Sequence, residues 1–133
     1  MSKDVFDFLA ANRPFYLATV EGAAPKVRPM GFLMWHEDKI WLGMGDHKNV
    51  YKQIKANPKV EIATTNPDSS WLRVFGSLEF VDKPGLFELA LETMPQLKDI
   101  YPEGGPRMGI GYLKEATAQF VNIRGEVTKT VNF

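Results

Sequence analysis

The chain has 133 residues, 44% of them hydrophobic and 12% aromatic, which is the composition of a globular protein and suits one domain over residues 1–133. The sixteen basic and sixteen acidic side chains cancel, so the charge gives no electrostatic footprint for nucleic acid or for an anionic membrane. The absence of cysteine, of a signal-peptide pattern and of any apolar run long enough to span a bilayer excludes disulfides and thiolate metal sites and predicts a cytoplasmic protein.

Periodicity and turn residues divide the chain into short strands and helices. Apolar residues spaced three and four apart predict helices, and apolar runs bounded by Gly, Pro, Asn or Asp predict strands. In chain order we expect a helix that ends before Arg13, strands at residues 15–20, 26–35 and 39–44, a helix that follows Asp46 and runs to about Ala56, strands at residues 59–65 and 71–81, a helix that starts at Pro84 and ends at Pro95, and strands at residues 108–113 and 117–127.

Single residues set several of these boundaries. Pro29 cannot donate a ladder hydrogen bond, which places the second strand at a sheet edge or at a bulge. Asp46 is a good N-cap for the second helix, and Pro58 stops that helix. Pro84 fits the first position of the third helix. Together these elements give six or seven mostly antiparallel strands and three short peripheral helices. They predict a mainly β fold whose sheet closes into an antiparallel barrel.

The sequence carries none of the common catalytic motifs. It has no G-x-S-x-G, no G-x-G-x-x-G and no Walker loop. The two histidines are His36, in an expected turn, and His47, which is either an exposed residue of a first helical turn or a ligand contact. Without cysteine and without H-x-x-x-H spacing, we expect no metal site.

Lys48 and Arg28 have positions that suit an anion. Lys48 is expected in the first turn of a helix, where unpaired N–H groups and the helix dipole favour a phosphate and disfavour an isolated lysine. Arg28 stands beside Pro29, and its planar fork suits a phosphate. The alternatives are a solvated surface lysine and an edge-strand charge that discourages aggregation.

Trp71 and Arg73 share one face of an alternating strand. An aromatic ring beside a guanidinium can line a planar ligand or an interface. The alternative is a partly exposed packing pair.

Three stretches resemble a known family when they are taken in order: PKVRPMGF, KIWLGMGDHKNVYKQIKANPKVEI and SWLRVFGSLEFVD. They resemble the pyridoxamine 5′-phosphate oxidase-like family of FMN-binding split barrels, and its short, oxidase-related members most closely. The resemblance covers nearly the whole chain. It implies a six-stranded split barrel that works as a homodimer, with FMN bound at the subunit interface.

The resemblance also implies a set of cofactor-binding residues. Arg28 and Lys48 would hold the ribityl phosphate of FMN, and Trp71 would approach the flavin, often from the other subunit. The backbone on either side of the flavin and the residues around the lysine complete the set, which is Arg28, Pro29, Met30, Gly43, Met44, His47, Lys48, Asn49 and Trp71. Family members commonly carry Ser or Thr just before the lysine, where this chain has Asp46 and His47, and His47 would act as a substitute donor.

The function expected from the resemblance is that of a flavoprotein oxidoreductase, which would transfer electrons or hydride through FMN to a small substrate. No side chain stands out as an acid or base, so we name no catalytic residue. One alternative is a flavin carrier or sensor without turnover. A second, suggested by Asp46 and His47, is a split barrel that binds a different phosphorylated ligand. The arginine and histidine segment with which the true oxidase holds pyridoxine phosphates is not found after residue 127, so we do not expect that substrate.

Overall fold

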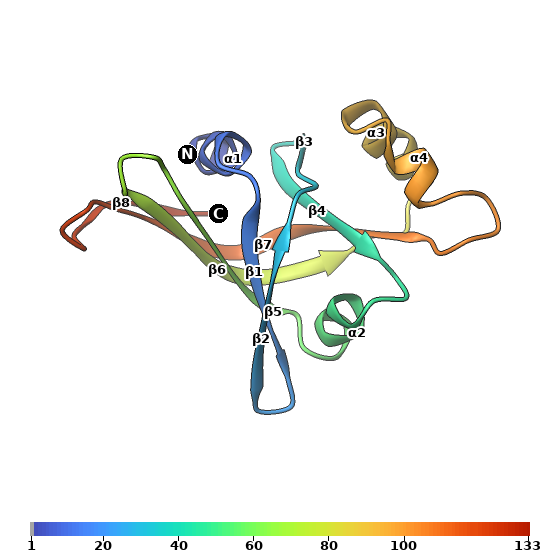
Figure 1. The fold of residues 1–133 in the computed structure, drawn as a ribbon, viewed down its shortest axis with the longest axis horizontal. Helices are drawn as coiled ribbons and strands as arrows, with labels where there is room; N and C mark the ends of the chain where they lie inside the picture. Colours follow the sequence, from blue (N-terminus) through green and yellow to red (C-terminus); the bar gives the residue numbers. More distant parts are fainter. Residues whose placement is uncertain (1) are drawn as a thin grey trace.

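The pairing order of the strands sets the architecture (Figure 1). The structure is a computed structural model that describes residues 2–133. The strands are β1 (Phe15–Glu21), β2 (Ala24–Met30), β3 (Met34–His36), β4 (Lys39–Gly45), β5 (Lys59–Thr65), β6 (Trp71–Phe80), β7 (Met108–Val121) and β8 (Val127–Asn132). The helices are α1 (Ser2–Ala11), α2 (Asn49–Ala56), α3 (Leu86–Thr93) and α4 (Leu97–Ile100). The strands form one antiparallel sheet of eight in the order β2-β1-β5-β6-β7-β4-β3, and β8 also pairs with β7.

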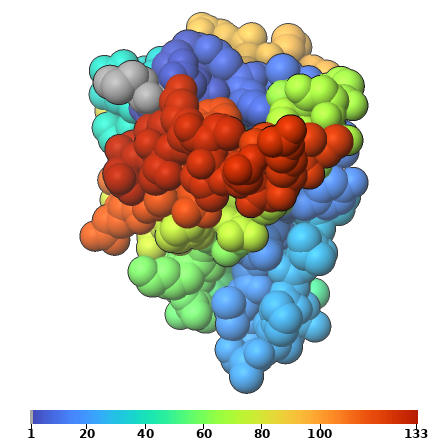
Figure 2. All heavy atoms as spheres, turned by 90° about the vertical axis from the view of Figure 1, so that its left-hand side faces the viewer, coloured from blue at the N-terminus to red at the C-terminus, as the bar shows by residue number. Residues whose placement is uncertain are grey.

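The sheet is a split barrel because β2 and β3 stand at its two ends and do not pair with each other. The mainly β, antiparallel split-barrel fold predicted from the sequence is therefore confirmed, with eight strands where six or seven were expected and four helices where three were expected. Figure 1 shows α2 beside the β1–β2 hairpin, while α3 and α4 lie together at another corner. In Figure 2 the C-terminal segment crosses one side of the molecule as a band, and the β1–β2 hairpin projects beyond it.

The strand expected at residues 26–35 is wrong in its length, because the chain leaves the sheet after Met30. β2 pairs with β1 at one end of the sheet, whereas β3 pairs with β4 at the other end. The connecting residues Phe32 and Leu33 cross between the two ends as buried side chains, 5% and 2% exposed. The edge position predicted for Pro29 is confirmed, since β2 has β1 as its neighbour on one side alone.

The break expected near residue 114 is also displaced. β7 is continuous through that region, with Glu115 at a φ of 50°. The chain reverses instead after Val121, where the Asn122 side chain accepts hydrogen bonds of 3.0 Å from the backbone N–H groups of Arg124 and Glu126. A side-chain oxygen that binds nearby N–H groups stabilises a turn, and here that turn separates β7 from β8.

The capping residues predicted for α2 and α3 are wrong. The N-cap of α2 is Lys48, in an extended conformation and without a side-chain cap hydrogen bond. The N-cap of α3 is Gly85, at a φ of 87°, so Pro84 precedes the helix. Asp46 instead extends the pairing of β4 with β7: its N–H donates to the carbonyl of Arg107 at 2.8 Å, and its Oδ1 accepts from the Arg107 N–H at 3.2 Å.

Two hydrophobic clusters hold the elements together. The larger one fills the barrel and seats α1 and α2 on the sheet; Val5, Leu9, Leu17, Leu42, Ile54, Ile62 and Leu72 are among its members. The smaller one lies under α3 and α4 and contains Phe32, Met34, Trp41, Leu86, Ala90, Leu97 and Ile110. Within residues 2–133, no helix is both long enough and apolar enough to cross a membrane.

Candidate functional site

An open groove of about 590 Å³ lies between the β1–β2 hairpin and the start of α2, and we call it the α2 groove. Hairpin and helix are brought together because Val50 and Ile54, on one side of α2, are buried in the main core. The residues that line the groove are Glu21, Lys26, Val27, Arg28, His47, Lys48, Asn49, Val50 and Gln53.

The Arg28 side chain is held in the groove by buried polar partners. Its Nη1 donates to Thr19 Oγ1 at 2.7 Å and to the Leu17 carbonyl at 3.3 Å, and its Nη2 donates to Gln53 Oε1 at 2.7 Å. Thr19 and Gln53 are 2% and 6% exposed, and the Thr19 hydroxyl also donates to Gln53 Oε1 at 2.5 Å. A guanidinium has five N–H donors, so these three bonds leave two for a ligand.

The groove favours an anion. Lys26, Arg28 and Lys48 line it together with the single carboxylate of Glu21. Partial burial lowers the pKa of Arg28, but an arginine keeps its charge at neutral pH. The first N–H groups of α2 have no intrahelical acceptor and add a partial positive charge at the same end. A phosphate bound here would meet side-chain cations and helix N–H groups at once.

His47 lies in the groove, whereas Asp46 does not. The His47 imidazole packs against Gly45, where a Cβ atom would come within 2.6 Å of the ring, so this position of the ring requires a glycine. Asp46 lines a different, smaller pocket of about 270 Å³ together with Arg107 and Tyr51. The carboxylate of Asp46 is therefore directed to β7 and is not part of the groove lining.

The structure places the nine residues expected to bind the cofactor in three regions. Arg28, His47, Lys48 and Asn49 line the α2 groove, and Pro29 and Met30 follow Arg28 along β2. Gly43 and Met44 are buried in β4. The remaining residue, Trp71, opens β6 opposite Thr65 and Val121 and is not part of the groove lining.

The Gly43 backbone is covered by side chains of its own chain. A Cβ atom at this glycine would collide with Met108 Cε and would lie 3.2 Å from Phe32 Cδ2. A group that approaches Gly43 from the side of this Cβ position must therefore displace the flexible end of Met108.

Sequence reasoning missed Thr19 and Gln53, which position Arg28. A signal was present for Gln53, because it lies three residues after Val50 and one before Ile54, within the stripe of α2 that faces the core. A buried polar residue in such a stripe needs a hydrogen-bond partner. No group of three or more His, Asp or Glu side chains that could hold a metal ion is found among residues 2–133.

The fold and the groove define a split-barrel protein with a groove lined by cations, and the comparisons with known proteins give its family. The sequence model for pyridoxamine 5′-phosphate oxidase matches residues 1–109, which is most of the chain. The chain therefore belongs to the pyridoxamine 5′-phosphate oxidase family. A comparison with curated protein sequences found no match.

Solved structures agree with this family. A NimC/NimA family protein from Clostridium acetobutylicum is 32% identical with a TM-score of 0.86, over 99% of this chain and 90% of that one. A heme-binding protein from Mycobacterium smegmatis is 14% identical with a TM-score of 0.72, over 99% of this chain and 58% of that one. A FAD-binding protein from Mesorhizobium loti is 15% identical with a TM-score of 0.59, over 89% and 93%. The last two likenesses concern the fold alone.

Proposed function

We propose that the protein is an FMN-binding homodimer that transfers electrons or hydride between the flavin and a small molecule. The observation that carries the proposal is the α2 groove, where Arg28 is fixed beside Lys48 and the start of α2. A terminal phosphate is the part of FMN that such a groove would hold. Membership of the pyridoxamine 5′-phosphate oxidase family supports a flavin as the rest of the ligand.

The residues have separate parts in this proposal. Arg28 and Lys48 would neutralise the phosphate, while His47 and the backbone N–H of Asn49 would donate hydrogen bonds to it. The bound flavin supplies the redox chemistry, and the protein binds it and sets its orientation. Because Trp71 lies outside the groove of its own chain, its expected contact with the flavin would have to come from a second copy.

The location of Asp46 favours FMN over the alternative of a different phosphorylated ligand. The alternative was suggested by Asp46 and His47, which stand where family members commonly carry Ser or Thr. Asp46 binds the backbone of Arg107 and does not line the groove, so its carboxylate is not directed at a phosphate bound there, while His47 lines the groove as a candidate donor. A carrier or sensor would use the same groove, and kinetics must separate it from an oxidoreductase.

The first test compares the affinities for FMN and riboflavin, which differ by the phosphate. Loss of a charged hydrogen-bond donor costs about 1.5–3 kcal/mol, so Arg28→Ala and Lys48→Ala should each weaken FMN binding by about 10- to 100-fold. Riboflavin binding should change little. Lys52→Ala is the matched control, because Lys52 lies on α2 but not in the groove lining.

Two results would contradict the proposal. One is a protein that is colourless when purified and takes up no added FMN. The other is an unchanged FMN-to-riboflavin affinity ratio in both variants.

Stopped-flow reduction of the FMN-bound protein by NADH or NADPH then distinguishes an oxidoreductase, which is reduced rapidly, from a carrier or sensor, which is not.

A further inference from the structure

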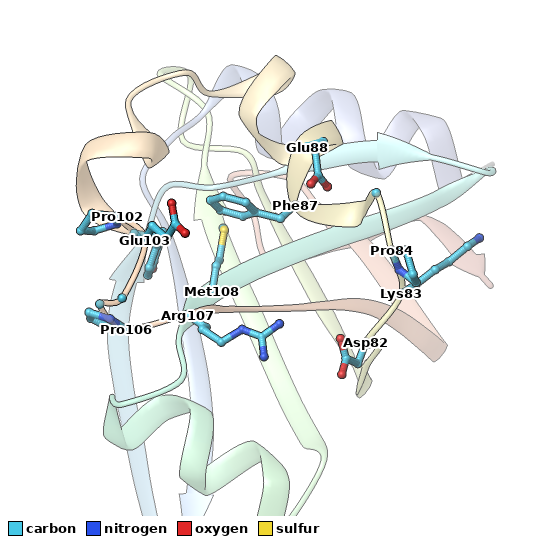
Figure 3. A pocket seen from close by; sticks show the side chains of 14 residues that line it. Asp82, Lys83, Pro84, Phe87, Glu88, Pro102, Glu103, Pro106, Arg107 and Met108 are labelled. Carbon is cyan, nitrogen blue, oxygen red and sulfur yellow. The ribbon is translucent and has the colours of Figure 1, made fainter.

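A second hollow, of about 540 Å³, lies between the connection from β6 into α3 and the loop that precedes β7 (Figure 3). We call it the α3 hollow. It shares no residue with the lining of the α2 groove. Its volume is within the usual range for sites that bind small molecules, which is about 300–1,000 Å³. Its walls come from residues 82–85, Phe87 and Glu88, from residues 101–107, and from Met108 at the start of β7.

One wall of the α3 hollow is aromatic and apolar. The rings of Phe87 and Tyr101 pack edge to face, with centroids 6.4 Å apart at an angle of 85°. Figure 3 shows the Met108 side chain next to the Phe87 ring in the same hollow. All three residues pack against the small hydrophobic cluster yet are only partly buried, so apolar surface remains for a ligand. Ring faces and a methionine thioether are well suited to contact a flat aromatic molecule.

The opposite side of the hollow is polar. In Figure 3 the guanidinium of Arg107 points across the hollow toward the carboxylate of Asp82. The backbone of Arg107 is fixed by two hydrogen bonds with Asp46, one to its N–H group and one to its carboxylate. Within residues 2–133, neither Arg107 nor Asp82 forms a salt bridge. A donor facing an acceptor across a space suits a ligand edge that carries both an acceptor and a donor.

The charge of the lining favours an uncharged ligand. The carboxyl groups of Asp82, Glu88 and Glu103 stand against the cations of Lys83 and Arg107, so the lining is close to neutral. The α2 groove differs in this respect, since cations dominate its lining. A charged molecule would gain little from entering the α3 hollow and would lose hydration.

The hollow adjoins the part of β4 where the flavin is expected. Met108, which lines the hollow, also covers the backbone of Gly43. Tyr101, another lining residue, has its Cε1 atom 3.5 Å from the place of a Cβ atom on Gly45. Burial, and then the charge of Asp46, raise the pKa of Tyr101, so its phenol stays a hydrogen-bond donor at neutral pH.

We propose that the α3 hollow binds a flat, uncharged heteroaromatic molecule with a hydrogen-bond donor and acceptor on one edge, and that this molecule is the substrate of the flavin. The role as substrate rests on the proposed function, whereas the binding itself does not. Phe87 and Met108 contact the ring of the molecule, and Arg107 and Asp82 bind its polar edge.

Three probes test the binding by titration of the ¹⁵N-labelled, full-length protein as purified. Nicotinamide has the required ring and amide, cyclohexanecarboxamide keeps the amide without a flat ring, and nicotinate keeps the ring with a negative charge. We expect nicotinamide to shift the amide signals of residues 82–88 and 101–108 at millimolar concentrations, and to bind at least fivefold more tightly than either of the other probes. Shifts confined to the α2 groove, or no preference for nicotinamide, would overturn the proposal.

Variants assign the contacts. Phe87→Leu and Arg107→Met should each weaken nicotinamide binding at least fivefold, whereas Lys98→Ala should not, because Lys98 is exposed on α4 and is not part of the lining of the hollow. Arg107 is exposed, so its variant remains informative even where Phe87→Leu disturbs α3. Unchanged binding by Arg107→Met refutes the role of this side chain. The absorbance spectrum of the same sample gives the flavin content, so a failure of flavin binding is recorded separately from a failure of the hollow.

Discussion

Arg28 illustrates how a buried residue controls an exposed one. Its charge faces the α2 groove, but its orientation depends on Gln53, whose Oε1 accepts from both Arg28 and Thr19. Gln53 is held in turn by α2, which packs on the core through Val50 and Ile54. The polar partners of Arg28 thus connect the orientation of its charge, and with it the proposed phosphate binding, to the packing of α2.

Gln53 is therefore predicted to be a positioning residue for the phosphate. Gln53→Leu removes the acceptor and should lower stability by about 1–2 kcal/mol and FMN affinity about tenfold, with riboflavin affinity nearly unchanged. Gln53→Glu keeps an acceptor for Arg28 but neutralises its charge, so it should fold well and still bind FMN weakly. Thermal unfolding and flavin titration measure the two effects. Exposed Gln96→Leu is the control.

The outcome for Gln53→Leu decides between two roles. If Gln53 only holds the fold together, Gln53→Leu should lower stability and still bind FMN like the original protein. Binding at full strength would therefore contradict a role in which Gln53 orients the charge of Arg28.

Local chemistry selected some candidate site residues that lie in one groove and misplaced other residues. Arg28 and Lys48 were selected from a strand proline and a helix start, and the structure brings them to one groove. The sequence predicted Asp46 as a helix cap, because a cap is recognised from the residues next to it in the chain. Its actual partner, Arg107, is 61 residues away, and no local pattern contains that information. The same holds for Thr19 and Gln53, which are 34 residues apart.

Among the strands, β7 has the largest number of pairing partners in the sheet. It pairs with β6, β4 and β8, and its Gly111 lies opposite Phe80 of β6 and Leu42 of β4. A Cβ atom at Gly111 would lie 2.7 Å from the carbonyl oxygen of Glu79, which is too close for strands in their present positions.

Gly111→Ala is predicted to weaken the pairing of β6 with β7. Forcing extra volume against backbone costs about 1–3 kcal/mol, which should lower the melting temperature by about 5 °C or more. Gly31→Ala is the matched control, because nothing lies within 4 Å of its Cβ position. Thermal unfolding by circular dichroism measures both. Equal melting temperatures for the two variants would show that the strands can separate without cost.

The elements that sequence patterns predicted best were those with strong boundaries. The residues expected for β5 match the structure, and those for α2 and β6 match closely, because Asn, Pro and Asp interrupt the pattern beside them. The uninterrupted apolar stretch at residues 29–35 concealed the break between β2 and β3. That break exists because the two halves pair with different strands, β1 and β4, and pairing partners are set by the whole sheet.

At the scale of the whole molecule, one outer face of the sheet exposes three large apolar side chains beside the Arg73–Glu61 salt bridge. Val27, Ala18, Glu61, Phe75 and Thr117 lie side by side across β2, β1, β5, β6 and β7, and so share a face. Tyr16 belongs to the neighbouring row of the same face. The side chains of Tyr16, Val27 and Phe75 are 50%, 67% and 40% exposed. Exposed apolar side chains gathered on one face are typical of an interface.

This face is where we expect the second copy of the proposed homodimer. Phe75→Glu puts a charge into the contact of each subunit, at a cost of ~2 kcal/mol or more per subunit, so the dimer should weaken about a hundredfold or more. Ile100→Glu is the control, because Ile100 is 55% exposed at the end of α4. Light scattering at micromolar concentration reports the mass.

Trp71 lies on the same face, two residues from Arg73, and would reach the flavin from the partner, so FMN affinity should fall together with dimerisation. A Phe75→Glu protein that stays dimeric would place the interface elsewhere, and a monomer that binds FMN at full strength would mean that one chain completes the flavin site.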